Sequence, residues 1–157
     1  MELESLLPLS RVVPDMEISS KKRALQSLSQ LLSENDTGLD EDDIFDSFLA
    51  RERLGSTGLG KGVAIPHGRM ASAKEAHAAI IKLDKGIAYD SPDEAPVDLL
   101  IGLVVPEEST EEHLQILACL AEILGEEKSL EQLRKADSGE EIYRVISSSK
   151  CFEAQPV

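Results

Sequence analysis

The sequence predicts an α/β domain in which a β-sheet is flanked by helices. Two apolar runs, residues 76–83 and 99–105, have the length and composition of strands, and the second is continuous enough to be buried on both faces. Segments with helical periodicity and capping residues lie on either side of these runs, so strands and helices interleave along the chain. The length of 157 residues and the 41% apolar content suit a single folded domain, which we expect to span residues 1–157.

Two helices are predicted before the first of these strands. Ser20 is suited to cap the first helix, which the Asn35–Gly38 stretch ends. The apolar residues of this helix recur with helical spacing. Asp40 is suited to cap the second helix, whose acidic first turn faces the positive end of the helix dipole. Gly55 is expected to stop this second helix. The apolar positions are Ala24, Leu25, Leu28, Leu31 and Leu32 in the first helix, and Ile44, Phe48 and Leu49 in the second.

Capping-box patterns predict the helices that follow the second strand. Pro106 closes that strand, and the next helix runs through Leu124 and is ended by Gly125. Two shorter helices are expected after it, near the C-terminus. In each pattern a serine precedes Glu or Gln by three residues; the pairs are Ser109 with Glu112, Ser129 with Gln132, and Ser138 with Glu141.

The charge balance excludes two classes of partner. The chain has 30 acidic and 16 basic residues and a formal net charge of -14. Such a chain repels nucleic-acid phosphates and anionic lipids, so we expect neither nucleic-acid binding nor membrane insertion. The same charge favours a basic protein partner.

The remaining composition indicates a cytoplasmic protein. Cys119 and Cys151 are too few for a disulfide framework, and we interpret both as reduced thiols. The stretch Met1–Pro14 contains acidic residues and lacks the basic and long apolar regions of a signal peptide. No segment has the roughly 20 apolar residues that a membrane span needs.

A glycine-dense segment, residues 55–62, leaves the second helix. Gly55 to Lys61 matches the first seven positions of a nucleotide-binding P-loop, but Gly62 stands where that motif needs a hydroxyl for magnesium. The context is also reversed, because a P-loop leaves a strand and enters a helix. A second interpretation is that Gly58, Gly60 and Gly62 let the chain turn closely around a small anion. A third is a tight connector without a ligand.

His67 follows this segment and is the principal candidate for chemistry. It lies between Pro66, which restricts the approach of the chain, and Gly68, which leaves one side of the imidazole uncovered. A neutral histidine nitrogen can attack phosphorus when an acceptor holds the proton on the other nitrogen. His67 therefore fits a histidine that carries a phosphoryl group.

Arg51 and His113 are candidates for binding the phosphoryl oxygens. A guanidinium matches the geometry of phosphate oxygens, and His113 falls near the start of the helix after Ser109, where backbone amides are free. Taken alone, Arg51 could instead pair with acidic residues on a helix face, and His113 could be an ordinary helix residue. A zinc site of His67, His77 and His113 is an alternative, although their separations match no compact ligand motif.

These residues resemble a known family. The similarity consists of Arg51, the run Gly55-Ser56-Thr57-Gly58-Leu59-Gly60 and the run Gly62-Val63-Ala64-Ile65-Pro66-His67-Gly68. It continues with Pro96-Val97-Asp98-Leu99-Leu100, Val105-Pro106 and His113-Leu114, and covers about residues 20–146. Together these motifs resemble the fructose/mannitol-type (type 2) enzyme IIA domain of the bacterial phosphotransferase system.

The resemblance implies a phosphotransferase that works as a phosphohistidine carrier, with an α/β fold whose mixed, mostly parallel sheet has helices on its faces. His67 corresponds to the phosphorylated histidine, Arg51 to the arginine beside it and His113 to the second active-site histidine. We expect the glycine segment to supply further phosphate-binding groups, at Ser56, Thr57, Gly58 and Gly60. Neither a metal nor another cofactor is required.

The resemblance also implies the partners. In this family a histidine phosphocarrier protein is the donor, and the group passes to a IIB domain or the protein regulates targets by binding them. The opening Ser20-Lys21-Lys22-Arg23-Ala24-Leu25 looks like the nitrogen-regulatory branch, which acts on nitrogen, carbon and potassium metabolism. A sugar-specific IIA for fructose or mannitol, a binding switch without onward transfer, and a homodimer stay open.

Overall fold

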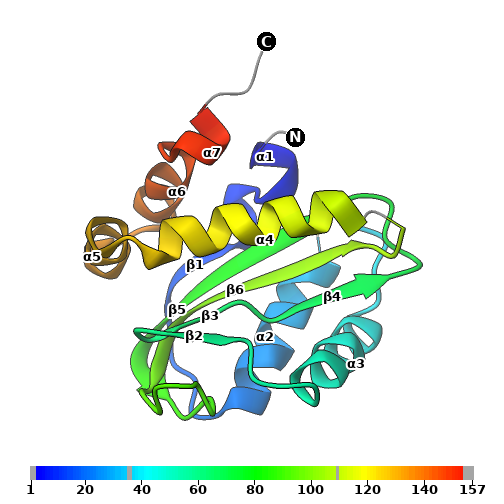
Figure 1. Ribbon diagram of the computed structural model, residues 1–157, viewed down its shortest axis with the longest axis horizontal. Helices are drawn as coiled ribbons and strands as arrows, with labels where there is room; N and C mark the ends of the chain where they lie inside the picture. The colour runs from blue at the N-terminus through cyan, green and yellow to red at the C-terminus, as the bar shows by residue number, and fades with distance from the viewer. Residues whose placement is uncertain (1–2, 35–36, 109, 154–157) are drawn as a thin grey trace.

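One mixed sheet organises the computed structural model, which describes residues 3–34, 37–108 and 110–153 (Figure 1). The sheet has six strands in the order β1-β5-β6-β3-β2, and β4 also pairs with β6. β1 pairs in parallel with β5, and β3 and β4 pair in parallel with successive parts of β6, whereas β5–β6 and β2–β3 are antiparallel. The strands are β1 (Val12–Met16), β2 (Gly58–Gly60), β3 (Val63–Ala64), β4 (His67–Met70), β5 (His77–Ile87) and β6 (Val97–Pro106).

Helices cover both faces of this sheet (Figure 1). The helices α2 (Lys21–Ser33) and α3 (Glu41–Glu52) pack on one face. The other face carries α1 (Leu3–Leu6), α4 (Thr110–Gly125), α5 (Glu127–Lys135), α6 (Gly139–Ser147) and α7 (Lys150–Glu153), and the 3-10 turn Leu9–Arg11 leads into β1. The predicted α/β fold with a mixed sheet between helices is confirmed. Within the described residues, no helix combines the length and apolarity needed to cross a bilayer.

β6 lies at the centre and separates two hydrophobic cores. Its side chains alternate as expected for a strand buried on both faces. Leu99, Ile101, Leu103 and Val105 belong to the core beneath α4, and Leu100 and Val104 belong to the core beneath α2 and α3. A Cβ atom added to Gly102 would lie 3.2 Å from Leu28, so α2 approaches β6 closely at this point.

Three of the predicted helix caps are confirmed. The side chain of Ser20 accepts a hydrogen bond from the Arg23 amide at 3.2 Å. Asp40 accepts one from the Asp43 amide at 3.1 Å, and Ser138 accepts one from the Glu141 amide at 3.1 Å. These side chains satisfy backbone donors that a helix leaves unpaired in its first turn.

The other two capping-box predictions have different outcomes. Ser109 lies outside the described residues. The start predicted at Ser129 is wrong, because α5 begins at Glu127 and Glu126 occupies the cap position without a side-chain hydrogen bond. Leu130 and Leu133 are buried in the core beneath α4, so tertiary packing decides where this helix lies.

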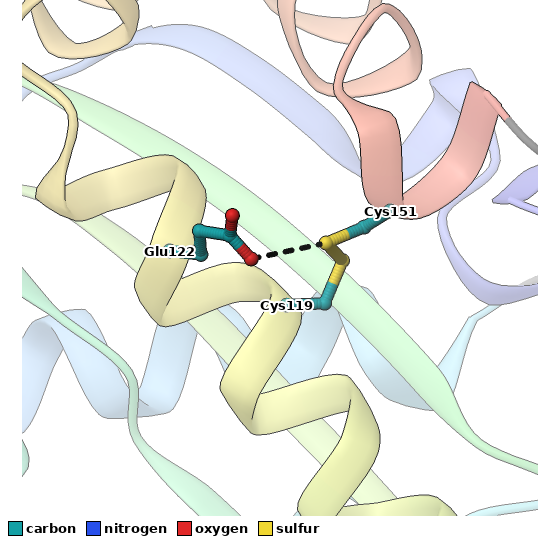
Figure 2. The surroundings of a disulfide bond; sticks show 3 residues. All are labelled: Cys119, Glu122 and Cys151. Atoms are coloured by element: carbon teal, nitrogen blue, oxygen red, sulfur yellow. Dashed lines mark hydrogen bonds between the residues drawn. A yellow bond between two sulfur atoms is a disulfide. The ribbon is translucent and has the colours of Figure 1, made fainter.

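The prediction of two reduced thiols is also wrong. Cys119 of α4 and Cys151 of α7 form a disulfide, with their Cα atoms 5.8 Å apart (Figure 2). The Sγ atom of Cys151 lies 3.8 Å from a carboxylate oxygen of Glu122, one turn further along α4. α7 packs back onto α4 and places the two residues within bridging distance, although 32 positions separate them in the chain. Because the two cysteines are bridged, their state does not support the cytoplasmic location expected from the sequence.

Arg11 is a buried cation that fastens the N-terminal segment to the sheet. Arg11 is only 2% exposed. Its guanidinium donates to the carbonyl oxygens of Ala78 at 2.9 Å and Leu6 at 3.1 Å. It also lies 3.4 Å from Nδ1 of His77. Burial lowers the pKa of Arg11, and burial together with the Arg11 charge lowers the pKa of His77. His77 is therefore neutral, and its Nδ1 atom accepts the hydrogen bond from Arg11.

We expect Arg11→Met to lower the free energy of unfolding by about 2–3 kcal/mol, because it leaves two buried carbonyl oxygens without their donor. Urea unfolding followed by circular dichroism measures this change. Arg23→Met is the matched control, since Arg23 is exposed and its side chain has no hydrogen bond or ion pair in the described part of the chain. Equal stability of both variants would contradict the assigned role of Arg11.

Candidate active site

His67 begins β4, and its imidazole has a defined tautomer. The residue pairs with Leu103 of β6, and its Nδ1 atom lies 2.7 Å from the carbonyl oxygen of Ile65. A carbonyl oxygen can only accept a hydrogen bond, so Nδ1 carries the proton. Nε2 consequently keeps its lone pair and is the nucleophilic atom.

His113 lies beside His67 at the start of α4. The two ring centroids are 5.5 Å apart, and the ring planes are inclined at 60°. His113 is only 9% exposed, and within the described residues its Nε2 atom is buried without a hydrogen-bond partner. A buried polar atom of this kind is costly unless a ligand or water satisfies it. The geometry therefore leaves one imidazole nitrogen free to contact a bound group.

Both imidazoles are neutral at neutral pH. Burial is the main reason that the pKa of His67 lies below its ordinary value, and the positive charge of Arg51 lowers it further. Burial also lowers the pKa of His113, with additional contributions from His67 and Arg69. Since free histidine has a pKa of about 6.5, values below this leave the nucleophilic nitrogen unprotonated at pH 7.

Arg51 reaches this site from the last turn of α3. Its Nη1 atom donates to the carbonyl oxygen of Gly55 at 2.9 Å, which orients the guanidinium. The helix can approach β4 because residue 68 is glycine: a Cβ atom there would lie 2.1 Å from Oγ of Ser47. Ser47 is one turn before Arg51, so this close approach brings the cation to the histidine.

One open cavity of about 550 Å³ joins the three residues. Arg51, His67 and His113 all line it, as the sequence predicted that they would lie together. The cavity also contains Arg69, which sequence reasoning missed. Arg69 is two positions after His67 on a strand, and residues at this spacing share a face, so the signal was present. The rest of the lining is Ser47, Ala50, Leu54, Gly68 and Glu107.

The four predicted phosphate-binding residues of the glycine segment lie elsewhere. Ser56, Thr57, Gly58 and Gly60 are not among the residues that line the cavity. Several of their donors have partners within the protein: Thr57 donates its amide and hydroxyl to Glu52, and the Gly58 amide donates to Oγ of Ser56 at 3.1 Å. Ser56 in turn donates to the carbonyl oxygen of Tyr89 at 3.2 Å. The segment supports the site and does not face it.

The same segment lacks the architecture of a P-loop. It leaves α3 and forms the antiparallel pair β2–β3, with Lys61 at the turn in a left-handed conformation (φ 58°). The Lys61 amide donates to the side chain of Asp93 at 3.0 Å. In the described residues, no three His, Cys, Asp or Glu side chains are grouped to hold a metal ion. His77, the third residue of the zinc alternative, contacts Arg11.

Comparison with known proteins assigns the family. The family model described as "Phosphoenolpyruvate-dependent sugar phosphotransferase system, EIIA 2" matches residues 5–149. The chain belongs to this EIIA type 2 family. The match spans every element from the 3-10 turn Leu9–Arg11 to α6, including the three cavity residues that the sequence motifs had indicated.

Relatives named as nitrogen regulatory proteins and relatives named as sugar-specific components both match the chain. A nitrogen regulatory protein of Pseudomonas aeruginosa is 38% identical over 146 residues, 93% of this chain and 95% of the relative. A PTS system fructose-specific EIIA component of Haloferax volcanii is 30% identical over 146 residues, which cover 93% of this chain and 95% of the relative. The crystal structure of nitrogen regulatory protein IIA-Ntr from Neisseria meningitidis is 44% identical, with a TM-score of 0.87, over 92% of this chain and 98% of that one.

Proposed function

We propose that this protein is a phosphohistidine carrier that accepts a phosphoryl group on Nε2 of His67 from a histidine phosphocarrier protein. The observation that carries the proposal is the hydrogen bond from Nδ1 of His67 to Ile65, which leaves Nε2 with a lone pair facing an open cavity. Membership of the EIIA type 2 family supports the same chemistry. We also propose that the protein acts in the cytoplasm, on the basis of its relatives and not of its cysteines.

The transfer needs an in-line approach and stabilisation of charge on the phosphoryl oxygens. The Nε2 lone pair of His67 forms the new P–N bond while the P–N bond to the donor imidazole breaks. Arg51 binds the oxygens from α3, and the unsatisfied Nε2 of His113 donates to them from α4. Arg69 adds a second guanidinium on the strand of the nucleophile. Neither a metal ion nor a nucleotide takes part in this scheme.

The mouth of the cavity suits a protein donor. Leu54 lines it and is 83% exposed, and Leu114, next to His113, is 61% exposed. Exposed apolar side chains around a polar centre are typical of protein interaction sites. We propose that the donor carrier covers these leucines while its own histidine enters the cavity, and that a regulatory target or a IIB domain uses the same surface afterwards.

The nitrogen-regulatory branch is the function that we favour. The nitrogen regulatory relatives reach 38% and 44% identity over more than nine-tenths of this chain. A sugar-specific role is the second candidate, because the fructose-specific relative from Haloferax volcanii matches the same length at 30% identity. Transfer of the phosphoryl group to a fructose or mannitol IIB domain would favour the second candidate.

Incubation with phosphoenolpyruvate, enzyme I and the carrier protein should place one phosphoryl group on the chain. We expect an acid-labile and base-stable linkage, because the product is a phosphoramidate, and peptide mapping should locate it at His67. Nitrogen-15 NMR of the phosphorylated protein should assign it to Nε2. A label on a serine, on His113 or on Nδ1 of His67 would contradict the proposal.

A further inference from the structure

The Ser20–Leu25 run that resembles the nitrogen-regulatory branch has a structural link to the active site. Lys21, the first residue of α2, lies 2.9 Å from a carboxylate oxygen of Glu52 at the end of α3. Its ammonium also donates to the carbonyl oxygen of Tyr89 at 3.2 Å and lies 4.4 Å from the centre of the Tyr89 ring. The neighbouring Lys22 is exposed, so only the first of the two lysines is held in this way.

Glu52 is a buried carboxylate with several donors. Its side chain is 7% exposed, and it accepts the Thr57 amide at 3.2 Å as well as the Thr57 hydroxyl. The hydroxyl of Tyr89 lies 3.1 Å from Oγ1 of Thr57 and completes the group. Burying a carboxylate is costly unless a cation and hydrogen bonds compensate for the lost water, and Lys21 and Thr57 provide them.

The contacts continue from Thr57 to the nucleophile. The carbonyl oxygen of Thr57 accepts the amide of Ile65 at 3.1 Å. The carbonyl oxygen of Ile65 accepts Nδ1 of His67 at 2.7 Å. Glu52 holds Thr57, and Thr57 holds the backbone of Ile65. The Ile65 carbonyl oxygen that sets the tautomer of His67 is therefore positioned through this segment. A chain of direct contacts joins α2, the end of α3, the glycine segment and the imidazole.

We propose that Glu52, held in place by Lys21, is a positioning residue for His67, acting through Thr57 and Ile65; this inference rests on the proposed phosphoryl-carrier function. Glu52 does not line the cavity and touches no reacting atom. It fixes the acceptor that keeps the proton on Nδ1 and therefore keeps Nε2 available. The glycine segment, expected from sequence to bind phosphate, transmits this restraint.

The negative charge of Glu52 also acts on the pKa of His67. Burial lowers the pKa of His67 and Arg51 lowers it further, whereas the bond to Ile65 and the negative charge of Glu52 raise it. The other charged or titratable groups that line the cavity beside His67 and Arg51 are Arg69, Glu107 and His113. Removing the Glu52 charge should therefore lower the pKa of His67 and loosen the Nδ1 hydrogen bond.

The test compares Glu52→Gln with Lys22→Met, which changes an exposed residue of the same motif. Nitrogen-15 NMR of the unphosphorylated proteins reports the tautomer and the pKa of His67. We expect Glu52→Gln to lower this pKa and reduce the share of the Nδ1–H tautomer, while Lys22→Met matches the parent protein. Phosphoryl uptake from saturating phosphorylated carrier should slow by roughly 10- to 100-fold in Glu52→Gln, with an unchanged KM for the carrier.

Lys21→Met provides a second route to the same effect if Glu52→Gln does not fold. It leaves Glu52 without its cation, and the double variant Lys21→Met with Glu52→Gln removes both charges together. We expect Lys21→Met to perturb the His67 signals, and the double variant to match Glu52→Gln. A folded Glu52→Gln or Lys21→Met protein with parental His67 tautomer, pKa and uptake rate would overturn the positioning role. A parent protein that takes up no phosphoryl group would overturn the proposed function, while the NMR result would still report on the contacts.

Discussion

Replacing His67 with glutamine should abolish phosphoryl uptake. Glutamine keeps a hydrogen-bonding side chain of similar reach but has no ring nitrogen with a lone pair that can form a P–N bond. The measurement is incorporation of radioactive phosphate from phosphoenolpyruvate in the presence of enzyme I and the carrier. Because the nucleophile itself is missing, we expect incorporation at the background level even after long incubation.

His77→Gln is the control for this experiment. His77 is buried beside Arg11, away from the residues that line the cavity, so its replacement should leave full incorporation. Labelling of His67→Gln at a parental level would show that the phosphoryl group is carried by another residue. Loss of labelling in both variants would point to a general requirement for intact histidines and not to a single acceptor.

His113→Ala should slow phosphoryl transfer by on the order of 10²–10³-fold while the protein stays folded. The Nε2 atom of His113 is buried and lacks a partner among the described residues, so it is free to donate to an oxygen that gains charge during transfer. Burial lowers the pKa of His113, and a neutral imidazole donates from Nε2 in the tautomer that carries its proton there. Rapid-quench measurement of a single turnover from the phosphorylated carrier gives the rate.

The KM for the carrier separates chemistry from docking in this variant. If His113 stabilises the transferring group, the rate at saturating carrier falls and the KM changes little. Gln115→Ala is a matched control, because Gln115 is an exposed residue two positions further along α4. Transfer at the parental rate in His113→Ala would mean that His113 serves only to pack the start of the helix.

Local signals predicted the parts of the fold that depend on short stretches of sequence. The caps at Ser20 and Asp40 were predictable because a side chain close to the first turn satisfies its free amides. β5 and β6 were predictable because their apolar runs match strands buried in a sheet. β1 was not predicted, since it contains Pro14 and lies at the edge of the sheet, where patterning is weak.

The unpredicted features depend on contacts between distant parts of the chain. The Cys119–Cys151 bridge and the start of α5 follow from how helices pack on α4. In the site, Arg51, His67 and His113 were recognised from motifs, and the structure places them in one cavity. The sequence did not show that the glycine segment lies outside the cavity lining. Thr57 is held by the carboxylate of Glu52, and the charge of Glu52 is balanced by Lys21 in another helix.

The double pairing of β6 has a consequence for how the protein opens. β6 is bonded to β5 along one edge and to β3 and β4 along the other, and it separates the two cores. Its amide protons can exchange with solvent only when most of the molecule unfolds, whereas β2, at the sheet edge, can separate in small local fluctuations. His67 is paired to β6 and not to β2. The nucleophile is therefore paired directly to this slowly exchanging strand, and separation of β2 need not release it.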